Sequence, residues 1–259
     1  MIKTRGDFLQ HAFLEYVPGG IFINKPEGVS VHNQPGNDLC SLVDEYLRTH
    51  AGIREMTEFD PDFGVNPVHR LDKGTSGVML LAVNRDMFQF FSRQFEARTV
   101  DKIYLALVEG TVHKEEGEIN QPIANNMRDK GRMIIAKRGK PSLTLYKVVE
   151  RFKNYTLVEA NIKTGRTHQV RVHFEVIGYP LAVDSLYGRK DAFLLSEVKM
   201  KKYRRGKDVI EEKPLMSRTT LHAAKVTFNH PTTNESMTFE AELPKDFRAV
   251  LNQLRKWGI

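Results

Sequence analysis

The chain has 259 residues, 41% of them hydrophobic, which is enough to bury a sizeable core and excludes wholesale disorder. Its one cysteine, Cys40, cannot close an internal disulfide or supply the ligands of an iron–sulfur cluster. The longest apolar run, residues 78–83, is too short for a membrane span, and the N-terminus is too polar for a signal peptide, so we expect a cytoplasmic protein. The net charge is +7, but residues 1–65 carry −5 and residues 66–259 carry +12, which favours either a lysine-rich solvated surface or a polyanionic partner such as nucleic acid.

The first part of the chain predicts strands and helices that alternate irregularly. Residues 1–20 are expected to form a short extension. Strands are predicted where apolar runs are bounded by Pro, Gly or Asn, and helices where apolar residues recur every three or four positions after a capping residue. In chain order these are a strand at 21–24, a helix from Leu39 capped by Asn37 or Asp38, strands at 65–71 and 78–83, a helix capped by Asn84, and a strand at 102–109.

The second part of the chain predicts further strands at 143–150, 155–162, 219–229 and 236–241. Helices are expected at 167–177, which Gly178 stops, and at 245–257, where apolar residues follow helical spacing. The strands come in antiparallel-looking pairs, without strict alternation of strand and helix. We therefore expect an α+β fold, with a mixed, mostly antiparallel sheet flanked by helices, in one domain over residues 21–259.

Two polar segments stand out, whereas the sequence contains no P-loop, no dinucleotide-binding glycine pattern and no metal-ligand spacing. In the first segment, Asp72 lies at a turn between two predicted strands and has cationic neighbours, although an Asp at a turn is usually a local cap. In the second, residues 163–173, Arg166 lies at a tight turn before a helix. The guanidinium, imidazole and amide donors gathered there suit a phosphate or a fixed carboxylate partner.

Together with five other segments, these two resemble, in order, the motifs of the RluA family of RNA pseudouridine synthases. The resemblance covers about residues 20 to 257. One departure is that Val183-Asp184 replaces the more common Gly-Asp pair. The matching segments are Asn24-Lys25-Pro26-x-Gly28-x-x-x-His32, His69-Arg70-Leu71-Asp72-x-x-Thr75-Ser76-Gly77, Lys102-x-Tyr104-x-Ala106-x-Val108-x-Gly110, Gly139-Lys140-Pro141-x-x-Thr144-x-Tyr146, Thr164-Gly165-Arg166-x-His168-Gln169-x-Arg171-x-His173, Pro180-x-x-x-Asp184-x-x-Tyr187-Gly188, and Leu221-His222-Ala223 with His230-Pro231.

The resemblance implies isomerisation of specific uridines in ribosomal or transfer RNA to pseudouridine, with no cofactor and no metal. Asp72 would act at the anomeric carbon, or would remove the 2′ proton of the sugar. Tyr104 would stack on the uracil and take part in the proton transfer at carbon 5. Arg166 would keep Asp72 ionised as a buried ion-pair partner within about 3 Å. Arg70 would fill the space left by a flipped-out uridine, or would contact a phosphate.

Further RNA contacts implied by the resemblance are His69, Thr75, Lys140, His168, Gln169 and Arg171. The basic segments at 128–140 and 189–218 would be RNA-clamping loops. Because many family members carry an additional N-terminal RNA-binding domain for which this sequence has no counterpart, we expect the catalytic domain itself to supply the affinity for structured RNA. A monomer with no membrane partner is expected.

Two other functions fit parts of the pattern. A nucleoside or glycoside hydrolase could use the same Asp72 but needs a second catalytic carboxylate, for which Asp184 is the only candidate within the motifs. A non-catalytic RNA-binding module would tolerate the loss of Asp72 or Tyr104, yet both are present. An assay on uridine-containing RNA separates the three, since an isomerase releases no free base, a hydrolase releases uracil, and a binding module changes nothing.

Overall fold

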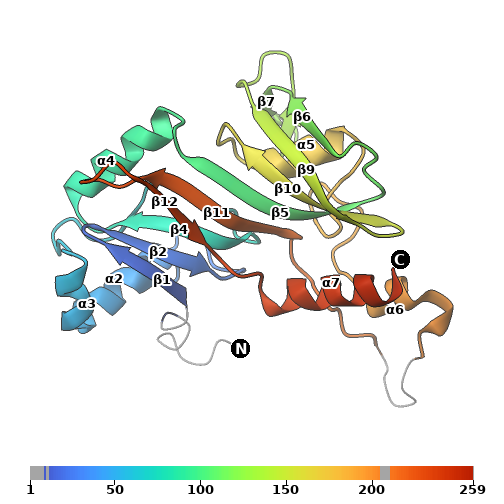
Figure 1. Cartoon of the computed structure of the whole chain (residues 1–259), viewed down its shortest axis with the longest axis horizontal. Coiled ribbons are helices and arrows are strands. Elements are labelled where there is room, and N and C mark those ends of the chain that lie inside the picture. The colour runs from blue at the N-terminus through green and yellow to red at the C-terminus, as the bar shows by residue number, and fades with distance from the viewer. Residues whose placement is uncertain (1–8, 10–11, 205–210, 259) are drawn as a thin grey trace. The chain divides into compact units, whose positions relative to one another are not determined.

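The computed structural model describes residues 9, 12–204 and 211–258 and contains two compact units (Figure 1). The chain passes from one unit to the other three times, and two of these passages fall inside a β-strand. No Gly- or Pro-rich linker therefore marks a boundary in the sequence. The first unit comprises residues 1–103 and 223–242, and the second comprises residues 104–222 and 243–259.

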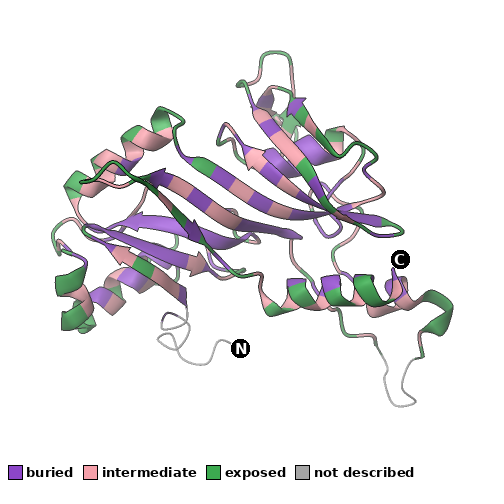
Figure 2. Cartoon of the chain, viewed as in Figure 1, coloured by how far each residue is buried: buried purple, intermediate pink, exposed green. Residues whose placement is uncertain are grey.

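The first unit is an antiparallel sheet with helices. The sheet order is β1-β2-β4-β11, with β12 paired to β11 and β3 paired to β4. Strand β4 is buried along its whole length (Figure 2). The elements are β1 (Phe13–Val17), β2 (Gly20–Lys25), α2 (Leu39–Thr49), α3 (Ala51–Met56), β3 (Asn66–Pro67), β4 (Ser76–Ala82), α4 (Arg85–Glu96), β11 (Leu221–Asn229) and β12 (Ser236–Glu240).

Capping residues mark the starts of two helices in this unit. The Asp38 side chain accepts a hydrogen bond from Ser41 N at the start of α2, and Asn84 accepts one from Met87 N at the start of α4. Helix α3 was not expected, because it buries no residue and has no side-chain cap, so the sequence shows no apolar period there. The strand expected at 65–71 is limited to β3, since Pro67 has no N–H to continue the ladder.

Within the described residues, the second unit combines four sheet strands, a separate hairpin and three α-helices. The sheet order is β5-β10-β9-β6, and β7 pairs with β8 as a two-stranded sheet. Its core is formed by α7 residues such as Phe247 and Leu251 packed with Leu107 and Phe193. The elements are β5 (Asp101–Glu109), β6 (Glu116–Asn120), β7 (Ile123–Asn125), β8 (Met133–Ile135), β9 (Leu143–Arg151), β10 (Tyr155–Ile162), α5 (Gln169–Val176), α6 (Leu195–Lys199), the 3₁₀ helix η1 (Met200–Lys202) and α7 (Lys245–Trp257).

The expected α+β class with a mostly antiparallel sheet is confirmed. The expected extension over residues 1–20 contains β1, which pairs with β2, and its first residues, 1–8, 10 and 11, lie outside the described ranges. The division into this extension and one catalytic domain stays a prediction. None of the helices in the described ranges is long and apolar enough to cross a membrane.

Candidate active site

Asp72 lies in the first unit, in the turn between β3 and β4. Its side chain is partly buried, and its carbonyl oxygen accepts a hydrogen bond from Thr75 N at 3.0 Å. Gly77 follows with φ of +122°, and a Cβ on it would lie 2.1 Å from the carbonyl oxygen of Ala223. The glycine that ends the Asp72 motif is therefore required by the close approach of two backbones.

Lys25 has a role that the sequence analysis did not assign. Its side chain is fully buried, and the ammonium donates hydrogen bonds to the carbonyl oxygens of Pro26 (2.8 Å), Val29 (2.9 Å) and Lys73 (3.4 Å). Gly28 N donates to the same Lys73 oxygen at 2.8 Å. A buried charge is tolerated only with such partners. Lys25 thus fixes the residue next to Asp72, and the only sequence signal was its place in the first motif.

His69, Arg70 and Thr75 have different surroundings. His69 Nε2 accepts a hydrogen bond from Leu80 N at 3.0 Å, and its ring stacks on Phe95. The loss of water around the ring lowers the pKa of His69 to about 3, so the ring is neutral at neutral pH and offers no cation to RNA. Arg70 is exposed, with no side-chain hydrogen bond to any described residue. Thr75 is buried, and its Oγ1 has no hydrogen-bond partner among those residues.

Arg166 and Tyr104 belong to the second unit. Tyr104 is a buried residue of β5. Arg166 lies in the turn before α5, and its Nε donates to the carbonyl oxygen of Pro141 at 3.3 Å. Since Asp72 belongs to the first unit, the ion pair expected between Arg166 and Asp72 stays a prediction.

Gln169 ties the Arg166 turn to β9. Its Oε1 accepts hydrogen bonds from Thr164 Oγ1 (2.7 Å) and Arg166 N (3.1 Å). Its Nε2 donates to the carbonyl oxygen of Leu143 and to Thr144 Oγ1, both at 3.0 Å. Gln169 is buried and its amide is fully used in these bonds, so the geometry makes it a positioning residue for Arg166, and its expected RNA contact stays a prediction.

The same network continues to His173. The Nε2 of this buried ring is 3.0 Å from the carbonyl oxygen of Gln121, and its Nδ1 is 2.9 Å from Thr144 Oγ1. The carbonyl requires a proton on Nε2, which leaves Nδ1 to accept from the threonine hydroxyl. Burial lowers the pKa of His173, which keeps this neutral form.

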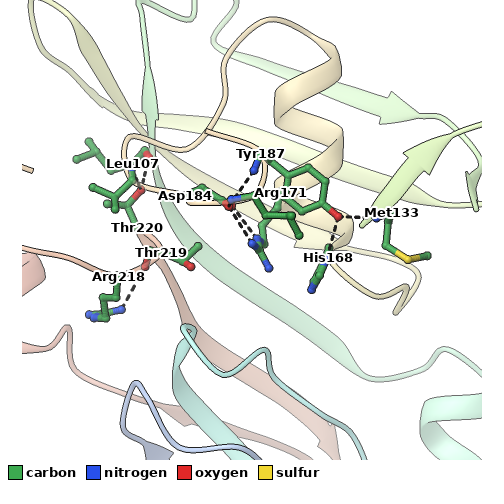
Figure 3. A network of polar contacts seen from close by, with 11 residues as sticks. Leu107, Met133, His168, Arg171, Asp184, Tyr187, Arg218, Thr219 and Thr220 are labelled. Carbon is green, nitrogen blue, oxygen red and sulfur yellow. Dashed lines mark hydrogen bonds and ion pairs between the residues drawn. The ribbon is translucent and has the colours of Figure 1, made fainter. Parts of the chain in front are cut away.

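A buried ion pair joins α5 to Asp184, in the segment between α5 and α6. The guanidinium of Arg171 donates to Asp184 from Nε (2.7 Å) and Nη2 (2.8 Å), as Figure 3 shows. Asp184 Oδ1 also accepts from the backbone N–H groups of Leu186 and Tyr187. Burial opposes ionisation of Asp184, but these hydrogen bonds and the charge of Arg171 hold its pKa below the ordinary value. The guanidinium of Arg171 thus binds the Asp184 carboxylate, and the RNA contact expected for Arg171 stays a prediction.

Tyr187 links three segments of the second unit (Figure 3). Its hydroxyl accepts a hydrogen bond from Met133 N in β8 at 2.7 Å and is 2.8 Å from His168 Nδ1. His168 has a left-handed backbone, with φ of 56°. The helix was expected to begin at Thr167, but α5 begins at Gln169, because the backbone of His168 is not in the right-handed helical region. The β7–β8 hairpin and the Arg166 turn therefore share one anchor.

A basic pocket of about 430 Å³ lies between this hairpin and the Arg166 turn. Arg138, Lys140 and Arg166 contribute its charged side chains, and no carboxylate lines it. A Cβ on Gly139 would lie 2.7 Å from the backbone of Ile123, so the loop needs glycine there to fold back on β7. The donors suit phosphate oxygens. The structure thus brings the expected residues Lys140 and Arg166 together.

Only one of the two basic segments is described in full. Residues 128–140 include β8 and contribute to the pocket, whereas residues 205–210 of the segment 189–218 lie outside the described ranges. Across the described residues, no group of three or more His, Cys, Asp or Glu side chains could hold a metal ion.

The comparisons with known proteins identify the family of the chain. The family model of RNA pseudouridylate synthase matches residues 20–176. The Bacillus subtilis protein named uncharacterized RNA pseudouridine synthase YlyB is 34% identical over 92% of this chain and 71% of its own length. Ribosomal large subunit pseudouridine synthase C of Haemophilus influenzae is 36% identical, over 91% of this chain and 66% of its own length.

A solved structure shows the same fold. Human RNA pseudouridylate synthase domain containing 4 superposes with a TM-score of 0.74 at 24% identity, covering 96% of this chain and 95% of its own. The family match extends over most of the first unit and over the Tyr104 and Arg166 segments of the second. The chain therefore belongs to the RNA pseudouridylate synthase family, and is an RNA pseudouridine synthase of the RluA type.

Proposed function

We propose that this enzyme isomerises specific uridines of ribosomal RNA, with Asp72 as the residue that acts on the sugar. The observation that supports this substrate is the 36% identity to proteins named ribosomal large subunit pseudouridine synthase C and D, over 91% of the chain. Transfer RNA is the other substrate class that the family resemblance implied, and it serves as the comparison substrate below.

The proposed chemistry needs one carboxylate and proton transfers. The bond between uracil nitrogen 1 and the sugar breaks, the ring turns, and carbon 5 bonds to the same sugar carbon. Carbon 5 then loses its proton and nitrogen 1 gains one, so the mass does not change. Asp72 acts at the anomeric carbon or at the 2′ proton, and Tyr104 assists the transfer at carbon 5. Arg166 is the third proposed catalytic residue, as the counter-ion of Asp72.

Asp184 is unsuited to the second catalytic role that a hydrolase would require. Its carboxylate is fully buried and makes two hydrogen bonds with Arg171. A general acid must instead be protonated near neutral pH, whereas the pKa of Asp184 is held below its ordinary value. This geometry favours the isomerase over the hydrolase.

The test is a product assay on large-subunit ribosomal RNA transcribed without modifications. The purified protein should form pseudouridine at a small number of defined positions and should release no free uracil. Transfer RNA transcripts under the same conditions should remain unmodified. Modification of transfer RNA alone would refute the proposed substrate, and release of uracil would refute the reaction.

The basic pocket gives a separate prediction. Lys140→Gln should raise KM for RNA several-fold and leave kcat nearly unchanged, because a lysine that contacts phosphate contributes to binding and not to the chemical step. Steady-state kinetics at several salt concentrations measure both parameters. Lys147→Gln, an exposed lysine of β9 outside the pocket, is the matched control. An equal effect of the two variants would contradict a role for the pocket.

A further inference from the structure

Three ammonium groups surround the ring of Trp257 in the second unit. The Nζ atoms of Lys199, Lys202 and Lys256 lie 5.4, 5.3 and 5.4 Å from the ring centroid. They come from α6, η1 and α7, and the packing of α6 beside the C-terminal end of α7 brings them together (Figure 1). We call Lys199, Lys202, Lys256 and Trp257 the Trp257 patch.

The positive charge of the Trp257 patch is not balanced within the described residues. No carboxylate among them lies within ion-pair distance of these three ammonium groups. Since each lies within 5.4 Å of one point, any two are within about 11 Å of each other, close to the Debye length of ~10 Å at 0.1 M salt. The C-terminus of α7 supplies roughly half a negative charge, which offsets only a small part of three positive charges.

The chemistry of the Trp257 patch fits a nucleic-acid strand. One part of the indole packs on the core, and its N–H is buried without an acceptor among the described residues, so packing holds the ring in place. Lys202 and Lys256 are exposed. Ammonium groups bind phosphates, and an aromatic ring beside them can stack on a base. Helix α6, with only five residues, is too short to act as an amphipathic membrane helix.

We propose that the Trp257 patch binds the phosphodiester backbone of the substrate RNA, through residues different from those of the Arg138–Lys140–Arg166 pocket. This inference rests on the proposed function, because that function makes RNA the partner. The Trp257 patch adds affinity without taking part in the chemical step.

Intrinsic fluorescence tests the proposal directly, because Trp257 is the only tryptophan of the chain. The full-length enzyme is titrated with a large-subunit ribosomal RNA fragment. Its emission should change saturably, with the same Kd as a filter-binding assay. Acrylamide should quench the bound form less than the free form, because RNA covers the exposed part of the ring.

A triple variant measures the contribution of the lysines. Lys199→Gln/Lys202→Gln/Lys256→Gln should flatten the plot of log affinity against log salt by about 2 to 3 units between roughly 50 and 200 mM, with kcat unchanged. The matched control replaces three exposed lysines of the second unit outside the Trp257 patch. The control variant is Lys114→Gln/Lys147→Gln/Lys245→Gln.

Each outcome decides the proposal. Unchanged Trp257 emission at saturating RNA, or equal flattening by the two triple variants, overturns it. A response to vesicles containing phosphatidylserine but not to RNA overturns it in favour of a membrane surface. Pseudouridine is measured in the same samples. If pseudouridine forms but the emission of Trp257 does not change, the inference about the Trp257 patch is refuted and the proposed function stands. If the emission changes but no pseudouridine forms, only the proposed function is refuted.

Discussion

Replacing Asp72 by Asn should reduce the rate of pseudouridine formation by about 10⁴-fold or more, the scale seen when a nucleophile is removed. The amide has almost the shape of the carboxylate but lacks the negative charge that acts at the sugar. RNA affinity should change only a few-fold, because the positive side chains proposed to contact phosphate remain. Single-turnover kinetics with saturating enzyme measure the chemical step, and filter binding measures affinity.

The control for this change is Asp62→Asn, which removes one exposed carboxylate from the same unit. Its activity should equal that of the wild type. Both variants should also unfold at the same temperature as the wild type, which separates chemistry from folding. Turnover of Asp72→Asn near the wild-type rate would remove Asp72 from the mechanism and leave the role of its motif open.

Replacing Arg171 by Met should lower the free energy of unfolding by about 3–5 kcal/mol at pH 7, since it leaves the buried carboxylate of Asp184 without its partner. In the wild type, the pKa of Asp184 is lower in the folded than in the unfolded protein. The ion pair therefore adds stability above the unfolded pKa of about 3.9, and this stability is lost as pH falls through the folded pKa. Urea denaturation from pH 7 down to about pH 2, which spans the region below the ordinary pKa of Asp, measures the effect.

In the Arg171→Met variant, Asp184 keeps its burial and its two backbone hydrogen bonds but loses the charge of Arg171, so its pKa should rise and its protonated form is favoured more than in the wild type. The stability difference from the wild type should therefore be largest near pH 7 and should shrink toward about pH 2. Adding Asp184→Asn should restore part of the loss, because it removes the unpaired charge. Arg255→Met is the control: it breaks the exposed pair with Glu150 and should cost less than about 1 kcal/mol. Similar losses for Arg171→Met and Arg255→Met would contradict the buried-pair account.

The sequence predicted those elements whose signals are local. Helix α7 has the expected limits, and α2 and α4 begin after the capping residues Asp38 and Asn84. Helix α3 escaped prediction because it buries nothing. Strands β6 to β8 were missed as well, since they have three to five residues each and little apolar alternation.

The candidate site was predictable as a set of motifs but not as a set of contacts. The family resemblance implied RNA contacts for Gln169 and Arg171, but the sequence did not show which groups within the protein already bind their donors. The amide partner of Gln169, Leu143, lies 26 residues away, and Lys25 reaches Lys73 across 48 residues. The sequence therefore supplied candidate residues, whereas the contacts that surround these residues are long-range.

The interleaved path of the chain has a consequence for synthesis on the ribosome. The first unit needs β12 and most of β11, which are made only after nearly the whole second unit. The second unit in turn needs α7, the last helix, to complete its core of Phe247, Val250, Leu251 and Leu254. Neither unit can therefore finish folding from a contiguous nascent segment. During synthesis from the N-terminus, the first unit has to wait for β12 and the second unit for α7.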